Sequence, residues 1–143
     1  TLIALYKWND AYIYDEVLYK KGMLNRDISR FLEASDIRES ITADSAEPKS
    51  IAELQGYGHN IHGVSKGRDS VVYGINLMNQ NEIYVSSRSK NLKKELGGYI
   101  WSTDKEGNKT HKPTGLHPDC IDAARYILTD TLENPNKGQY FIY

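Results

Sequence analysis

The stretch that decides the fold is ITADSAEPKS, residues 41–50. Its first three residues are a short apolar run that predicts a β-strand, and Asp44 follows directly. Pro48 suits the first position of a helix, because its φ angle is already helical and its missing N–H needs no partner there. We therefore predict a strand, a turn and a helix, with Asp44 at the carboxyl end of the strand. In open α/β sheets, ligands bind at this edge.

Asp44 has two interpretations, and a second acidic pair far downstream bears on the choice. An Asp that precedes a helix often serves only as its cap. Asp119 and Asp122, however, lie near the start of a helix that Pro118 is predicted to open, and their spacing puts them on one face. The positive end of the helix would by itself explain Asp119. Asp122 adjoins the predicted buried stripe, where an unpaired carboxylate is costly.

Two aspartates from separate elements predict a site for a hard divalent cation. Carboxylate oxygens suit Mg²⁺ or Mn²⁺. Two such ions about 4 Å apart can activate water and stabilise the leaving oxygen in phosphodiester cleavage. Two carboxylates are few for such a site, so we expect a third.

Composition limits the class of protein. The chain has 143 residues, which suits one compact domain, and its formal net charge of −1 gives no overall positive field for nucleic acid. Local basic patches remain possible. The single cysteine excludes an intrachain disulfide and fits a reducing cytoplasm. No apolar stretch approaches the roughly 20 residues that a membrane-spanning helix needs, so we expect no membrane association.

The order of the predicted elements indicates an α/β fold. Strands are predicted at 2–8, 11–19, 40–43, 59–64, 82–86 and 99–101, and helices after Asn25, Pro48, Asp69, Ser89 and Pro118. In the helix capped by Asp69, we expect a buried stripe of Val71, Val72, Ile75 and Met78. A hairpin followed by strands alternating with helices predicts a layered domain with a mixed β-sheet flanked by helices. The polar stretch 102–113 is predicted to be a β-hairpin-like insert.

Several motifs, in a constant order, resemble one family. Residues 44–51, DSAEPKSI, resemble the signature of the nuclease domain of tailed-phage terminase large subunits. Further segments resemble later motifs of that domain: Lys66-Gly67, residues 70–75, the set Glu95, Tyr99 and Trp101, and the closing Asp122-Ala123 with Arg125-Tyr126. The match spans nearly the whole chain.

This resemblance implies a ribonuclease H-like fold and a metal-dependent DNA endonuclease. In the family, the domain follows an ATPase motor in the same chain and cuts concatemeric viral DNA during genome packaging. Its active site is a cluster of three acids that binds two divalent ions, Mg²⁺ or Mn²⁺. The implied partners are double-stranded DNA, the ATPase domain, the terminase small subunit and the portal protein. The implied location is the host bacterial cytoplasm.

The resemblance also assigns individual residues. Asp44 takes the place of the family's second acid and Asp122 that of the third. The first acid is expected to precede Thr1. We therefore expect 1–143 to be a single nuclease domain without the upstream ATPase domain and the start of the first strand, and the fragment to bind metal weakly and cut poorly. Asp119 stands where many members carry His, which makes it a candidate auxiliary ligand.

Other residues carry weaker predictions. Lys49, Lys66 and Arg68 flank the proposed site and are predicted to contact DNA phosphates, with solvated surface cations as the alternative. Cys120 lacks a neighbouring His to activate it and is interpreted as a small buried residue. Two other functions stay open. One is a different ribonuclease H-like nuclease of the resolvase or transposase type, and the other is a non-catalytic module that docks DNA or the portal.

Overall fold

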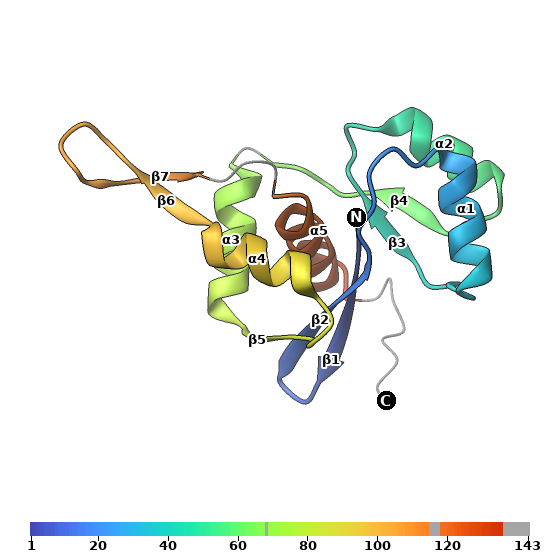
Figure 1. Ribbon diagram of the computed structural model, residues 1–143, viewed down its shortest axis with the longest axis horizontal. Coiled ribbons are helices and arrows are strands. Elements are labelled where there is room, and N and C mark those ends of the chain that lie inside the picture. Colours follow the sequence, from blue (N-terminus) through green and yellow to red (C-terminus); the bar gives the residue numbers. More distant parts are fainter. Residues whose placement is uncertain (68, 115–117, 136–143) are drawn as a thin grey trace.

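The computed structural model describes residues 1–67, 69–114 and 118–135, in which strands and helices alternate as predicted (Figure 1). The strands are β1 (Leu2–Trp8), β2 (Ala11–Leu18), β3 (Ile41–Ala43), β4 (Ile61–Gly63), β5 (Glu82–Val85), β6 (Ile100–Thr103) and β7 (Lys109–Thr114). The helices are α1 (Asn25–Ala34), α2 (Pro48–Gly56), α3 (Ser70–Gln80), α4 (Lys90–Gly98) and α5 (Asp119–Glu133). The predicted α/β class is confirmed.

The strands are divided among separate sheets. The main sheet is mixed and has the order β1-β2-β5, in which β1 runs antiparallel and β5 parallel to β2. β3 and β4 form a second, parallel pair, and β6 and β7 form an antiparallel ribbon. The mixed sheet is therefore present, but β3, which leads to Asp44, does not pair with it in the part of the chain that the structure describes.

Helix α5 joins these parts and supplies much of the core. It packs against β1 and β3 and against helices α3 and α4. Ile121, Ala124 and Leu128 are buried, as predicted from their spacing. The hydroxyl of buried Tyr14 in β2 donates a hydrogen bond of 3.0 Å to the carbonyl of Ala124. Burying each large apolar side chain contributes about 1.5–3 kcal/mol, so α5 holds the two sheets in one body.

The predicted buried stripe of α3 is wrong at its start. Val71 is 38% exposed, whereas Gly74 and Ile75 are buried. Asp69 precedes the helix but has a left-handed φ of 61° and makes no side-chain capping hydrogen bond. The face of α3 that meets α5 is centred on a glycine, which carries no hydrophobic signal in the sequence.

The insert predicted at 102–113 is the β6–β7 ribbon, which starts two residues earlier at Ile100. Ile100 pairs with Thr114, and Asp104 accepts backbone hydrogen bonds from Glu106 and Asn108 in the turn. The ribbon projects away from the rest of the molecule (Figure 1). The apolar-aromatic residues 139–143 lie outside the described residues.

Candidate metal centre

Asp44 lies directly after β3, and its carboxylate accepts hydrogen bonds from three donors. The Ala46 N–H donates to Oδ1 at 2.8 Å, the Lys66 ammonium pairs with the same oxygen, and the Tyr126 hydroxyl donates to Oδ2 at 3.3 Å. The N-cap position of α2 belongs to Glu47. The interpretation of Asp44 as the cap of this helix is therefore wrong, because its carboxylate closes the turn before the helix and faces Lys66 and Tyr126.

Electrostatics keep Asp44 ionised. Partial burial on its own would raise the pKa of the Asp44 carboxyl, but hydrogen bonds from Lys66, Ala46 and Tyr126 outweigh it and lower the pKa. Burial likewise opposes charge on Lys66, yet its bond to Asp44 and its neighbour Tyr126 raise the pKa of its ammonium group. Both groups are charged at neutral pH, as a carboxylate ligand for a cation must be.

Asp122 lies in the first turn of α5 and has a basic partner on its own helix. Arg125 donates to Oδ1 of Asp122 at 2.5 Å. The Arg125 side chain is only 3% exposed, whereas that of Asp122 is 40% exposed. Arg125 therefore compensates the negative charge of Asp122, and the Asp122 carboxylate remains partly exposed to solvent.

Tyr126 connects the two aspartates. It is one helical turn beyond Asp122, on the same side of α5, and its hydroxyl contacts Asp44. The Lys66 ammonium lies 4.8 Å from the centroid of the Tyr126 ring, and the Arg125 guanidinium carbon lies 5.2 Å from it. The structure thus brings Asp44 and Asp122 into one network of charged side chains around a single aromatic ring.

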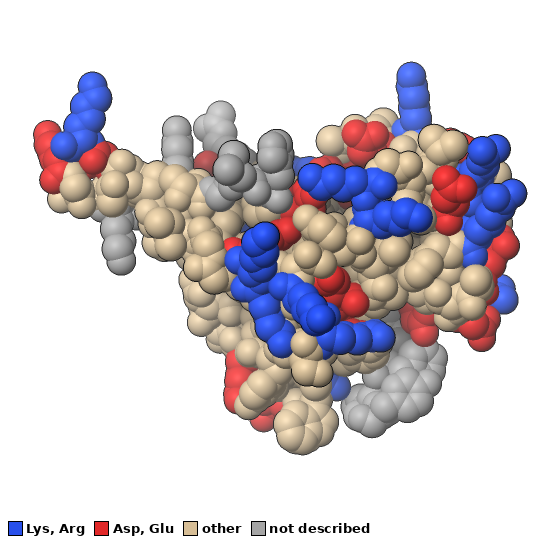
Figure 2. Space-filling view, viewed as in Figure 1, with Lys and Arg blue, Asp and Glu red and all other residues tan. Residues whose placement is uncertain are grey.

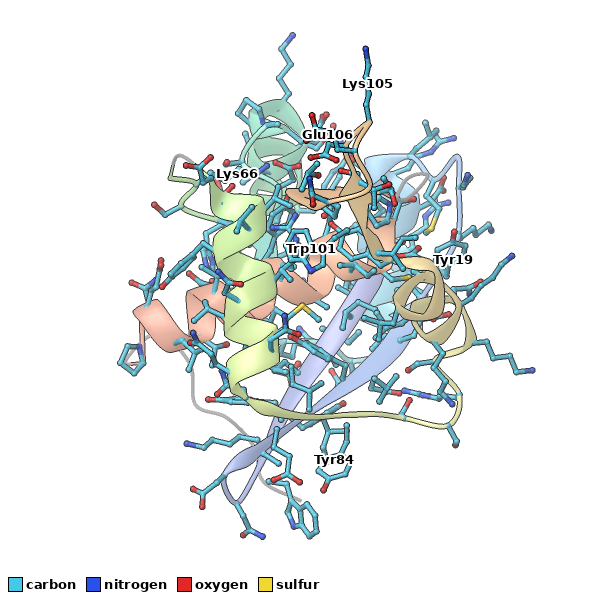
Figure 3. All side chains as sticks on the ribbon, turned by 90° about the vertical axis from the view of Figure 1, so that its left-hand side faces the viewer. Tyr19, Lys66, Tyr84, Trp101, Lys105 and Glu106 are labelled. Atoms are coloured by element: carbon cyan, nitrogen blue, oxygen red, sulfur yellow. The ribbon has the colours of Figure 1, made fainter. Side chains whose placement is uncertain are left out.

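A pocket of about 280 Å³ adjoins this network, between α3, α5 and the segment before α3. Its lining residues include Lys66, Ser70, Arg125, Tyr126 and Glu133. Lys66 lies beside the first turn of α3 (Figure 3). The network therefore borders a hollow that a ligand can enter.

The other predicted site residues are less engaged. Asp119 is exposed at the first position of α5, and Lys49 is exposed in the first turn of α2. Arg68 lies outside the described residues. Within the ranges 1–67, 69–114 and 118–135, no three His, Cys, Asp or Glu side chains are grouped closely enough to hold a metal ion. Asp44 and Asp122 offer the hard oxygen donors that Mg²⁺ or Mn²⁺ needs, but Asp119 does not complete a three-acid cluster.

Sequence reasoning missed three contacts at this site. It assigned no role to Arg125, although the i, i+3 spacing from Asp122 is a recognisable pairing signal. It likewise assigned no contact to Tyr126, although Arg125-Tyr126 belongs to the closing motif of the family. The third is Glu95 of α4, whose Oε2 accepts the N–H groups of Cys120 and Ile121 at 2.8 and 3.0 Å. Glu95 therefore caps α5 from another helix, and Cys120 is fully buried beside it, as predicted.

The family profile described as Terminase RNAseH like domain matches residues 2–130. The chain belongs to this family. The resemblance that the motifs carry, to the nuclease domain of terminase large subunits, is therefore confirmed, as is the ribonuclease H-like fold. These matches favour a terminase over the resolvase or transposase alternative.

Two relatives are themselves terminase large subunits. The large subunit of Bacillus phage SPP1 is 31% identical over 136 residues, which are 88% of this chain and 32% of that protein. The PBSX phage terminase large subunit of Bacillus subtilis (strain 168) is 31% identical over 120 residues, or 83% of this chain and 28% of that protein. The terminase domain thus spans about a third of the length of these relatives.

Two solved structures share the fold. The large terminase nuclease domain of bacteriophage SPP1, crystallised with bound Mn, superposes with a TM-score of 0.77 at 26% identity and covers 87% of this chain and 74% of its own. The large terminase of a thermophilic bacteriophage has a TM-score of 0.64 at 18% identity, with 91% of this chain and 36% of its own covered. The second likeness supports the fold alone.

Proposed function

We propose that this terminase domain is a divalent-metal-dependent endodeoxyribonuclease that cuts concatemeric viral DNA during genome packaging. The observation that carries the proposal is the network in which Tyr126 links Asp44 to the helix of Asp122. The similar SPP1 nuclease domain was crystallised with bound Mn, which supports a divalent ion as cofactor. Mg²⁺ and Mn²⁺ both suit carboxylate donors.

In this proposal, Asp44 and Asp122 are the ligands from this chain, and Asp119 is an auxiliary one. A pair of divalent ions, when bound, supplies an activated water and stabilises the leaving oxygen of the phosphodiester. Lys66 and Tyr126 orient the Asp44 carboxylate, and the reaction needs no protein nucleophile. The exposure of both carboxylates, 41% for Asp44 and 40% for Asp122, leaves them accessible to a DNA backbone.

We further propose that the two-ion site takes a third acid in addition to Asp44 and Asp122, as the family resemblance implies. β1 and β3 each lie at an edge of their sheet, and both contact α5. A strand placed between them would join the two sheets and bring its side chains next to Asp44. A third acid on such a strand would complete a site for which the described residues offer only two of the acids that two ions need.

The proposed substrate is double-stranded DNA, held through its phosphates. Lys49, Lys66 and Arg68 are the proposed phosphate contacts. Figure 2 also shows Lys and Arg side chains grouped over α4, which carries the exposed Lys90, Lys93 and Lys94. These side chains form a local positive patch, although the net charge of the chain is close to zero.

By family membership we propose the small subunit, the portal and the ATPase domain as further partners, in the host cytoplasm. No helix of the described residues is long and apolar enough to cross a bilayer.

The test uses Asp44→Asn and Asp122→Asn in the full-length protein, with Asp10→Asn as a matched control in an exposed turn. Mn²⁺-dependent cleavage of a supercoiled plasmid is measured for each. We expect each site variant to lose at least about 100-fold in rate while Asp10→Asn cleaves normally, because losing one ligand disrupts the two-ion site. Unchanged cleavage in both site variants would instead favour a docking module for DNA or the portal.

A further inference from the structure

We propose that Arg125 is a positioning residue that fixes the direction of the Asp122 carboxylate, and that Gly74 of α3 makes the room it needs. This proposal rests on the proposed function, in which Asp122 binds a divalent ion. It adds a role for two residues that do not themselves contact the ion or the DNA.

Arg125 is a buried charge with few partners. Its guanidinium donates to Asp122 and, at 3.3 Å, to the carbonyl of Ser70, while its Nε has no hydrogen-bond partner among the described residues. A guanidinium is planar and always charged, so its donors point in fixed directions. Because Arg125 is buried, it has little freedom to reorient, and Asp122 is the acidic side chain it binds. The hydrogen bond from the buried Arg125 guanidinium therefore fixes the orientation of the Asp122 carboxylate.

Gly74 determines where the stem of Arg125 lies. A Cβ on Gly74 would lie 3.2 Å from Cβ and Cδ of Arg125 and 3.3 Å from its Cγ. These distances are shorter than ordinary carbon contacts, which are optimal near 3.5–4.0 Å. A Cβ at Gly74 would therefore require the Arg125 stem to move by a few tenths of an ångström, which would shift its guanidinium relative to Asp122 and Ser70.

The contacts of Arg125 extend to the rest of the site. Ser70 is the first residue of α3 and follows the segment that carries Lys66, and the ring of Tyr126 lies beside the guanidinium. One buried side chain therefore holds the start of α3, Asp122 and Tyr126 in a fixed relation. Groups that bind a metal-ligating carboxylate commonly change metal affinity about 10–100-fold when they are mutated.

The experiment measures the Mn²⁺ dissociation constant of the full-length protein by isothermal titration calorimetry. The variants are Arg125→Lys, which keeps the charge but loses the fork of donors, and Gly74→Ala, which keeps Arg125 but displaces its stem. Gly97→Ala is the matched control, because Gly97 is also in a helix and has nothing within 4 Å of an added Cβ. Each titration is made at a temperature at which circular dichroism shows the variant folded.

We expect Arg125→Lys and Gly74→Ala to weaken Mn²⁺ binding by about 10-fold, and Gly97→Ala to leave it unchanged. A purely structural Arg125 would lower the melting temperature of both variants with Mn²⁺ affinity within about two-fold of the parent, and this result would overturn the proposal. If Arg125→Lys does not fold, Gly74→Ala decides alone. Asp122→Asn distinguishes failure of the proposed function from failure of the positioning role. If this variant leaves Mn²⁺ binding intact, the proposed function itself fails. If it abolishes binding while Gly74→Ala has no effect, only the positioning role fails.

Discussion

The phenolic hydroxyl of Tyr126 donates a hydrogen bond to Oδ2 of Asp44 at 3.3 Å, across 82 positions of sequence. This contact ties the carboxyl end of β3 to the middle of α5. Because Asp122 is one turn earlier on the same helix, the bond sets where the two acids lie relative to one another.

Tyr126→Phe tests that hydrogen bond. Phenylalanine keeps the ring beside Lys66 and Arg125 and removes only the hydroxyl. We expect the free energy of unfolding, measured by urea denaturation, to fall by about 1 kcal/mol. Tyr6→Phe is the control, because Tyr6 is 39% exposed in β1 and should change stability little. An equal effect in both variants would show that the bond to Asp44 contributes nothing specific.

Lys66→Met tests the proposed contact with DNA phosphates. If Lys66 binds a phosphate, its removal should reduce the slope of log affinity against log salt by about 0.9 for duplex DNA of any sequence. The measurement is fluorescence anisotropy at several salt concentrations. Lys20→Met, an exposed lysine that follows β2, is the control for loss of one charge. An unchanged slope in Lys66→Met would leave the lysine as a partner of Asp44 alone.

Asp15→Asn tests a second ion pair, away from the proposed site. Hydrogen bonds from Arg88, and from Ser86, lower the pKa of buried Asp15 against the opposing effect of burial. A lowered folded-state pKa stabilises the protein above the unfolded value of about 3.9, and this contribution is lost as the pH falls through the folded value. We expect Asp15→Asn to lower the free energy of unfolding by about 1–2 kcal/mol at pH 7.

The pH dependence is the sharper part of this prediction. The difference between parent and Asp15→Asn in urea denaturation should shrink as the pH falls below about 4, because the carboxyl of the unfolded chain then binds a proton. The difference should vanish once the pH falls through the lower pKa of the folded state. Asp36→Asn is the control, since Asp36 is highly exposed beside Arg38. A difference that is equal at pH 7 and pH 3 would contradict the assignment to the Asp15 carboxylate.

Cys120 should be inert in the folded protein. Burial, together with the nearby Glu95, raises the pKa of its thiol to about 12, and the residue has no exposed surface. We expect no reaction with a thiol-specific reagent at pH 8 until urea unfolds the chain, since only the exposed thiolate reacts. Rapid labelling of the native protein would show that the start of α5 opens locally.

Local chemistry explains which elements could be predicted. Pro48 and Pro118 mark the starts of α2 and α5, and the spacing of Ile121, Ala124 and Leu128 identifies the buried side of α5. These features act within a few residues. The exposure of Val71 depends on which side of α3 meets α5, so the local pattern predicts it wrongly. The division of the strands among sheets has no local signal either, since strand pairing joins residues far apart in the sequence.

The candidate site divides in the same way. The sequence by itself determined the family, the α/β class and the two candidate ligands Asp44 and Asp122, because short motifs record residue identity and order. Only the tertiary structure decided that Lys66 and Tyr126 bind Asp44 and that Gly74 lies against the stem of Arg125, which pairs with Asp122. These contacts join β3, the segment before α3, and α5. They depend on how those elements pack in space, and no local pattern of residues encodes that packing.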